Sequence, residues 1–273
     1  MTDPNLWNQL LVWPIINILM ALYKLSEFLH VPGPLGFAVI GLTIIIRLIL
    51  YPLMQAQLRS AKKMSAMKPH LDALGVKHKG DKTALQQAQM ALYKEHGVNP
   101  AAGCLPLLIQ MPVLIALYNV FYQVLSNGNL EKMLADLNQV AYASWLHIQT
   151  LDLRFFGINL GLKPSAWQTD GWWLLSIPLI TAALQYWQSK LMMPATSSTK
   201  SQALNPKQIQ KSNNKKEEEK KPDMAADMQK QMMIITPIMF GYFAFQFPLG
   251  LALYWNVFGL FGIMQQLAIN KEK

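Results

Sequence analysis

The chain has 273 residues, of which 52% are hydrophobic and only 14% charged, and its formal net charge is +9 at pH 7. This balance is typical of a protein that crosses a membrane several times and argues against an ordinary soluble domain. The basic residues lie between apolar runs, which favours a membrane topology signal over nucleic acid binding. A single cysteine, Cys104, excludes an intrachain disulfide and a metal cluster held by cysteines.

Residues 1–34 contain a weak hydrophobic stretch, Leu6–Phe28. Its polar interruptions make it a poor membrane crossing, and we interpret it as an interfacial helix on the outer leaflet. Trp7 and Trp13 would anchor it there. A sixth crossing, with the N-terminus inside, is the alternative. The interruptions are Asn8, Gln9, Pro14, Asn17, Lys24, Ser26 and Glu27.

Leu35–Leu58 is the first predicted span, and its one charged residue is Arg47 near the middle. A cation at that depth costs at least ~2.5–3.5 kcal/mol on insertion scales, so we expect it to face a hydrated or protein-lined cavity and to serve a function. An ion pair with an acid on a neighbouring helix is the ordinary alternative. The other long apolar runs contain no Asp or Glu. The sequence therefore predicts a positive charge whose partner comes from outside the chain.

Residues 59–100 are predicted to form a cytoplasmic helical hairpin. Apolar residues recur there every three to four positions, stop at the string GVKHKGD and then resume, which is typical of two amphipathic helices packed antiparallel. A simple solvated hairpin and a docking platform for substrate or partner both fit this pattern. The apolar positions are Leu58, Ala61, Met64, Met67, Leu71 and Leu74, then Leu85, Ala88, Leu92 and Tyr93.

The rest of the chain alternates between apolar runs and polar loops. The loop 194–231 is polar with almost no apolar content, and we expect it to be disordered. The string Phe247-Pro248-Leu249-Gly250 predicts a tight turn between the last two spans. The expected segments are the second span 101–125, an outer loop 126–171, the third span 172–193, the fourth and fifth spans 232–269 as a hairpin, and a tail 270–273.

The distribution of basic residues between the spans predicts the orientation. Basic residues concentrate in the first and third loops and are few in the loop 126–171, so the positive-inside rule puts the first and third loops in the cytoplasm. Five crossings then leave the N-terminus outside and the C-terminus inside. The residues are Arg59, Lys62, Lys63, Lys68, Lys77, Lys79, Lys82 and Lys94; then Lys132, Arg154 and Lys163; then Lys190, Lys200, Lys207, Lys211, Lys215, Lys216, Lys220, Lys221 and Lys230.

Catalytic patterns are missing from the sequence. It has no Gly-x-Ser-x-Gly or HExxH string, and its histidines lack metal-ligand spacing on an apolar helix. No span carries the paired acids, Ser/Lys dyad or coupling carboxylate that intramembrane proteolysis or ion-coupled transport would use. We expect neither an enzyme nor a bound metal or cofactor.

Uncharged polar residues recur in every predicted span. Thr43 lies one helical turn before Arg47 and shares its face. Any single polar residue in a span is more often a helix–helix contact than part of a path. The whole set, placed around an unpaired cation, predicts a water-filled groove. Its other members are Gln110, Asn119 and Gln123; Thr181, Gln185 and Gln188; Thr236; and Trp255, Asn256, Gln265 and Gln266.

Three strings carry a resemblance to a known family: LTIIIRLILYPLMQAQLRSAKKMSAMKPHLDAL, ALYKEHGVNPAAGCLPLLIQMPVLIALYNVFY and FPLGLALYWNVFGLFGIMQQL. They resemble the YidC family of membrane protein insertases, which has mitochondrial Oxa and chloroplast Albino relatives, and the likeness runs from about Leu6 to Ile269. It implies an all-α polytopic membrane protein. Five transmembrane helices would surround a polar groove, with an N-terminal interfacial helix and a cytoplasmic helical hairpin.

The resemblance also implies a set of groove residues. Arg47 and Thr43 match the family's groove arginine and the threonine one turn earlier, and Trp255 matches the aromatic of its Leu-Tyr-aromatic motif. Gln110 lies in the LLIQMP string. Asn256 follows Trp255, and Gln185 and Gln188 lie in a third span that matches more loosely.

The function that the resemblance implies is insertion of proteins into a bacterial plasma (inner) membrane, without the large outer domain of Gram-negative members. Short polar segments of nascent membrane proteins would pass through the groove, and their apolar helices would leave into the lipid. Expected partners are nascent membrane proteins, membrane lipids, the Sec translocon and, through the basic loops, the ribosome, with no small-molecule substrate. A passive channel or transporter using the same polar cavity is the alternative, and a chaperone role beside the translocon is compatible with insertion.

Overall fold

The computed structural model describes residues 2–78, 80–97, 111–119, 121, 130–192 and 224–271. This part of the chain is mainly helical, as predicted, and residues 111–119 of the second predicted span are helical too. Two short antiparallel strands, β1 and β2, were not predicted. The elements are a π-helical turn Asn8–Val12, α1 Trp13–Phe28, α2 Pro34–Ile49, α3 Tyr51–Ala66, α4 Lys68–Lys77, α5 Lys82–Glu95, α7 Leu130–Gln139, β1 Arg154–Phe155, β2 Ile158–Asn159, α8 Trp167–Asp170, α9 Ser176–Met192, α10 Met224–Gln246 and α11 Leu249–Lys271, with 3₁₀ turns Ser144–Leu146, Pro164–Ala166 and Trp172–Leu175.

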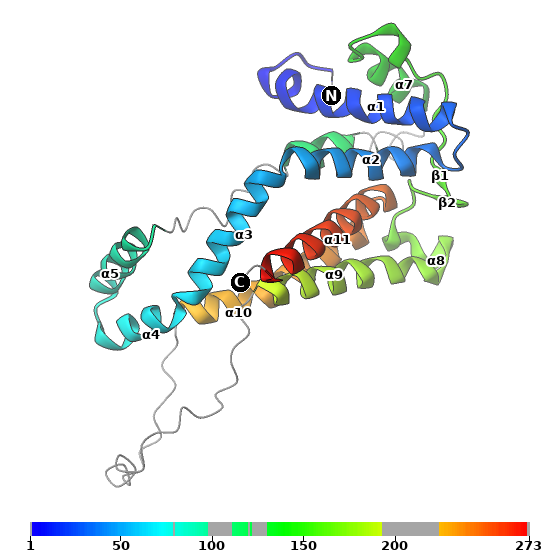
Figure 1. Cartoon of the computed structure of the whole chain (residues 1–273). Coiled ribbons are helices and arrows are strands. Elements are labelled where there is room, and N and C mark those ends of the chain that lie inside the picture. The colour runs from blue at the N-terminus through cyan, green and yellow to red at the C-terminus, as the bar shows by residue number, and fades with distance from the viewer. Residues whose placement is uncertain are drawn as a thin grey trace.

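Helices α1 and α2 form a helical hairpin (Figure 1). The buried face of α1 carries residues spaced three to four apart, as a helix packed along a neighbour requires. Leu22 lies so close to Gly41 of α2 that a Cβ there would be 3.3 Å from its nearest side-chain atom. The small residue therefore lets the two helices approach closely. The buried positions of α1 are Ile16, Asn17, Leu19, Met20 and Tyr23.

The segment after α7 runs along α1, and the buried side-chain amide of Asn17 bonds to its backbone. Asn17 donates from Nδ2 to the carbonyl of Val140 at 2.9 Å and accepts from the backbone N–H of Tyr142 at 2.7 Å. Both ends of the Asn17 side chain are thus satisfied by loop backbone. This explains how a polar residue is tolerated on the buried face of α1.

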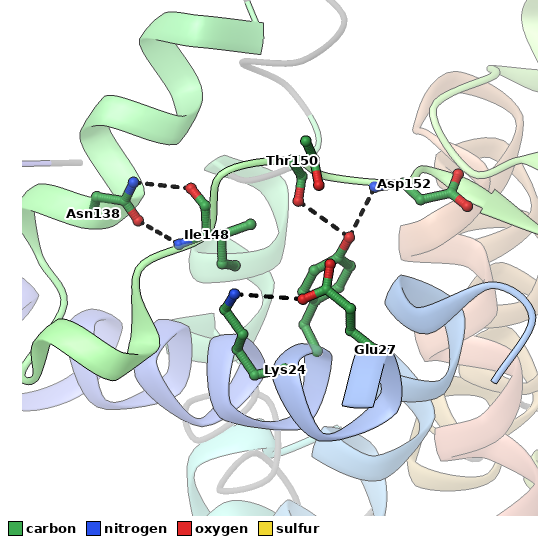
Figure 2. A network of polar contacts seen from close by, with 7 residues as sticks. Lys24, Glu27, Asn138, Ile148, Thr150 and Asp152 are labelled. Carbon is green, nitrogen blue, oxygen red and sulfur yellow. Dashed lines mark hydrogen bonds and ion pairs between the residues drawn. The ribbon is translucent and has the colours of Figure 1, made fainter. Parts of the chain in front are cut away.

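Further along α1, the hydroxyl of Tyr23 bridges two backbone groups of the same segment, those of Thr150 and Asp152, which are labelled in Figure 2. It donates to the carbonyl of Thr150 at 3.2 Å and accepts from the N–H of Asp152 at 3.0 Å. Asn138 of α7 closes the loop by bonding the backbone N–H and carbonyl of Ile148 at 2.8 and 3.0 Å. Side chains therefore replace the regular backbone pairing that this segment lacks.

The first predicted span is bent. The sequence predicts one helix over Leu35–Leu58, whereas α2 ends at Ile49 and α3 leaves at an angle of 63°. Pro52 accounts for the break, because it has no N–H to donate to the carbonyl of Leu48 and its ring would clash with that carbonyl in a continuous helix.

Helices α4 and α5 pack together at the far end of α3, away from the other helices (Figure 1). The predicted break between them is present, since α4 ends at Lys77 and α5 begins at Lys82, and the carboxylate of Asp81 caps α5 by accepting from the N–H of Ala84 at 2.9 Å. The predicted helix before the break is divided at Met67. A proline at the start of α4, Pro69, accounts for this division.

Helix α9 packs against both α10 and α11, and α11 in turn packs against α2. A helix break lies at the string Phe247–Gly250 as predicted, since α10 ends at Gln246 and α11 begins at Leu249. The backbone N–H of Gly250 bonds the carbonyl of Leu160 at 2.8 Å, which ties this turn to the loop 126–171. Helix α10 begins eight residues before the predicted start at residue 232, and the remainder of the loop predicted to be disordered, 194–223, lies outside the described residues.

The strands β1 and β2 hold the first turn of α2. Gly33 has φ of +82°, and a Cβ there would be 2.8 Å from the Cα of Phe155. At Gly36 a Cβ would be 2.0 Å from the ring of Phe155, which also meets Phe37 edge to face at 5.4 Å between centroids. Two glycines are therefore needed where β1 crosses the helix.

Within the described residues, two helical stretches are long and apolar enough to cross a membrane, Asn8–Phe28 and Leu249–Lys271. The bent pair Pro34–Ile49 and Tyr51–Ser60 makes a third if it is counted as one span, and Met233–Gln246 is a shorter apolar helix. The first of these is the stretch that we interpreted as interfacial. Its charges Lys24 and Glu27 pair with each other at 3.4 Å near the end of α1.

Candidate functional site

Arg47 lies in the last turn of α2 and is only 3% exposed. Thr43, one turn earlier, is fully buried, and its hydroxyl donates to the carbonyl of Val39 in the same helix at 2.7 Å. Thr43 is thus satisfied by its own helix and lies beside Arg47 as predicted.

The guanidinium of Arg47 contacts α11. Its Nη1 donates to Oε1 of Gln265 at 3.0 Å, and its Nη2 donates to the backbone carbonyl of Phe258. The ring of Phe258 lies over the cation, with Cζ 3.5 Å from the ring centroid, which is a cation–π contact. Two hydrogen bonds and one aromatic face therefore hold Arg47 against α11.

Gly262 makes this contact possible. In an α-helix the carbonyl of residue 258 already accepts the N–H of residue 262, so a second donor must approach past the side chain at that position. A Cβ at Gly262 would lie 2.9 Å from Nη2 of Arg47 and 2.4 Å from Nε2 of Gln188. The missing side chain leaves a notch on α11, the Gly262 notch, into which both polar groups reach.

Two of the predicted glutamines lie on α9. Gln188 is half-buried and reaches the Gly262 notch, so the structure brings it together with Arg47. Gln185 is also half-buried on α9. Gln110 lies outside the described residues.

The two remaining predicted residues of the last span occupy other faces of α11. Asn256 accepts through Oδ1 from the hydroxyl of Thr181 on α9 at 2.9 Å. Trp255 is buried among aromatic rings from α10 and the residue that follows it. Its ring centroid lies between 5.6 and 6.2 Å from those of Phe240, Phe243 and Phe247. These two residues therefore join helices, which is the structural alternative that the sequence left open.

The charge of Arg47 is not neutralised by its partners. Both acceptors that the structure gives for it, an amide oxygen and a backbone carbonyl, are neutral, and no carboxylate is among its partners within the described ranges. The sequence led us to expect a hydrated or protein-lined cavity around this side chain. In the structure α11 covers it, because the Gly262 notch admits the guanidinium to a helix carbonyl.

Sequence reasoning missed two residues of this site, Phe258 and Gly262. Gln265 was noted as one polar group of the last span, but nothing singled it out. The spacing of four and then three residues places the three on one face of a helix, which is the signal that could have found them. That a backbone carbonyl would be an acceptor was not visible in the sequence.

Comparison with known proteins places the chain among membrane proteins. The sequence model of the 60Kd inner membrane protein family matches residues 27–273. Membrane protein insertase MisCA of Bacillus subtilis is 32% identical over 274 residues, which cover 98% of this chain and 80% of that protein. Membrane protein insertase YidC of Helicobacter pylori strain J99 is 32% identical over 239 residues, and the match covers 88% of this chain but 33% of the relative.

Two further likenesses agree with these. The chloroplast inner membrane ALBINO3-like protein 1 of Chlamydomonas reinhardtii is 32% identical over 250 residues, or 88% of this chain and 44% of that protein. A crystal structure of an active YidC insertase matches with a TM-score of 0.52 at 24% identity, over 98% of this chain and 47% of that chain, which supports the fold. The chain thus spans between a third and four fifths of the length of these relatives.

Proposed function

This chain belongs to the 60Kd inner membrane protein family, which includes relatives named membrane protein insertases, and from that membership we propose that it inserts nascent membrane proteins into a bacterial plasma membrane. The observation that carries this proposal is Arg47. It is a buried cation whose partners are neutral, in a helix bundle whose apolar runs contain no acid. A permanent charge without a counter-ion is costly in a membrane, and its retention fits a role toward a passing anionic group.

In the proposed mechanism, a short polar tail or loop of a client enters from the cytoplasm between α2, α9 and α11. Arg47 attracts acidic residues of that segment, because charges interact more strongly in a partly buried site than in water. The apolar helix of the client then leaves sideways into the lipid. Burial of that helix and the membrane potential supply the driving force, so no nucleotide is required.

The remaining parts of the chain have roles in the same proposal. Thr43, Gln188 and Gln185 line the path beside Arg47, together with Gln110 of the second predicted span. The basic cytoplasmic segments 59–100 and 194–231 would meet ribosomal RNA electrostatically. The protein would act alone or beside the Sec translocon.

For the membrane arrangement we propose five spans with the N-terminus outside and the C-terminus in the cytoplasm. The distribution of lysine and arginine supports it, and contacts of α1 support an interfacial place for that helix. Irregular backbone is tolerated at hydrocarbon depth only where protein or water surrounds it. The loop that bonds Asn17 and Tyr23 runs along α1, so α1 fits better at the headgroup level.

This arrangement predicts the labelling of a cysteine at the N-terminus. A Thr2→Cys variant in a Cys104→Ser background should react with a membrane-impermeant maleimide in intact cells whose outer barrier has been removed. A Lys94→Cys variant, with its cysteine on exposed α5, should react only after lysis. Labelling of Thr2→Cys only after lysis would instead support a sixth crossing by Asn8–Phe28.

Reconstitution of the purified chain tests the function itself. The client is short, with one apolar helix and an acidic N-terminal tail. In vesicles that contain the protein, this tail should reach the interior and be protected from protease added outside. Empty vesicles should protect much less. Ion flux without client, together with no gain in protected client, would contradict insertion and indicate a channel.

A further inference from the structure

The site around Arg47 has more hydrogen-bond donors than acceptors. Among the described residues, the buried side-chain atoms that lack a hydrogen-bond partner are Nε of Arg47, Nε2 of Gln265 and Nε1 of Trp255. All three are N–H donors. Two of them belong to side chains that are bonded to each other, so the deficit of acceptors is concentrated where Arg47 meets α11.

A buried donor without an acceptor is costly, and folded proteins leave few such groups. Here the unpaired N–H groups flank a cation whose acceptors among the described residues are neutral, the carbonyl of Phe258 and the amide oxygen of Gln265. A group that brings acceptors and negative charge would relieve this deficit. A carboxylate has this chemistry, because it accepts at two oxygens and donates at neither.

Building on the proposed insertase function, we propose that Gln265 is a second recognition residue for client carboxylates. Without a client, Oε1 of Gln265 accepts a hydrogen bond from Nη1 of Arg47. When an acidic side chain of the client arrives, a carboxylate oxygen replaces Oε1 of Gln265 at Nη1 of Arg47, and Gln265 turns to donate from Nε2 to the same carboxylate. The side-chain amide of Gln265 thus accepts from Arg47 in the absence of client and donates to the carboxylate when the client is bound. Only a charged group such as this carboxylate releases Arg47 from α11.

The covered geometry explains why an acidic side chain is favoured over other anions. Arg47 is 3% exposed and the ring of Phe258 lies on its guanidinium, so the site admits a slender group rather than a lipid headgroup. Arg47 also lies near the middle of its apolar run, away from the depth of lipid phosphates. Attraction between opposite charges adds to the hydrogen bond in a buried site, so a carboxylate can displace the neutral acceptors where an amide cannot.

The test places a carboxylate at the position of the resident amide. Gln265→Glu puts an acid 3.0 Å from Nη1 of Arg47, where it becomes a permanent internal counter-ion. We expect insertion of a client whose tail carries two Asp to fall about tenfold, while a matched client with two Asn changes by less than about twofold. Gln246→Glu adds the same charge at an exposed position near the end of α10 and should leave both rates unchanged.

A second variant tests the same proposal in case Gln265→Glu does not fold. Gln265→Asn is too short to keep the contact with Arg47 and introduces no charge, so it should slow the Asp-tailed client several-fold more than the Asn-tailed one. Equal losses for both tails in both variants would show a purely structural role, or a role toward lipid phosphate, and would overturn the proposal. Unchanged insertion of the Asp-tailed client by folded Gln265→Glu would overturn it as well. Failure of the unsubstituted protein to insert either client would instead refute the proposed function.

Discussion

Replacing Arg47 with alanine is expected to slow insertion of an acidic-tailed client by about tenfold or more, the loss expected when charge-assisted hydrogen bonds to a carboxylate disappear. A client with an uncharged tail should be affected much less, because its tail gains nothing from the cation. Arg47→Lys keeps the charge but loses the planar fork that can hold a carboxylate through two parallel bonds. Arg47→Lys should therefore retain part of the activity. That result would show that the positive charge contributes more to client recognition than the bidentate geometry does. The measurement is the protease-protected fraction of client in reconstituted vesicles over time.

The control for Arg47→Ala concerns folding. Arg47 is buried between α2 and α11, so alanine leaves a cavity as well as removing a charge. Arg47→Met preserves most of the side-chain volume without the charge and should lose acidic-tail insertion as completely as alanine does. If a folded Arg47→Met protein inserts acidic and neutral tails at the rates of the unsubstituted protein, Arg47 does not steer the client.

The second large effect is expected at Gly262. A methyl group there would lie 2.9 Å from Nη2 of Arg47 and 2.4 Å from Nε2 of Gln188, closer than packed atoms come, so both side chains must leave the Gly262 notch. We expect Gly262→Ala to slow acidic-tail insertion nearly as much as Arg47→Ala. We also expect it to lower stability by about 1–3 kcal/mol, as overpacking does. Thermal unfolding in detergent and the client assay measure the two effects.

Gly259→Ala is the matched control for this substitution. It makes the same change one turn earlier on α11, where a Cβ would find Oε1 of Gln188 at 3.9 Å and Cβ of Leu184 at 4.0 Å, both ordinary contacts. The general gain from replacing glycine by alanine in a helix is common to both variants. Equal melting temperatures and equal insertion rates for Gly262→Ala and Gly259→Ala would show that the notch does not hold Arg47.

The sequence predicted the features that depend only on residues close together in the chain. The apolar run around Arg47, the break before Asp81 and the turn at Pro248 are local, and each is present. Pro52 lies within the predicted span, but the length of the apolar run suggested one continuous helix. A bend of 63° follows from local backbone geometry that hydropathy does not register.

The contacts of the site depend on distant parts of the chain, and the sequence could not supply them. Arg47 was identified because an isolated charge in an apolar run is visible without a structure. Its partners come from α11, more than 200 residues later, and one is a backbone carbonyl that only a glycine exposes. Trp255 was grouped with Arg47 on the family motif and Asn256 as the polar residue that follows it, yet a helix turns by 100° per residue and they face α10 and α9.

The loop between the second and third spans shows the same limit. Its composition gave no sign that Asn17 and Tyr23 would hold it along α1. Both are polar residues in a mainly apolar helix, and we took Asn17 only as an interruption of a possible span. In the structure it is a buried bonding group, in a stretch that passes as a span by length and composition.

The central claim, that Arg47 receives an acidic group of the client, is tested most directly by a cycle of four insertion rates. These are the rates for Asp-tailed and Asn-tailed clients, each with the unsubstituted protein and with Arg47→Ala. The unsubstituted protein should prefer the Asp tail, and the substitution should reduce that preference by a factor of about ten, because the cycle isolates the pairing from other effects of either change. A factor close to one, with both proteins folded and active on the Asn-tailed client, would contradict the claim.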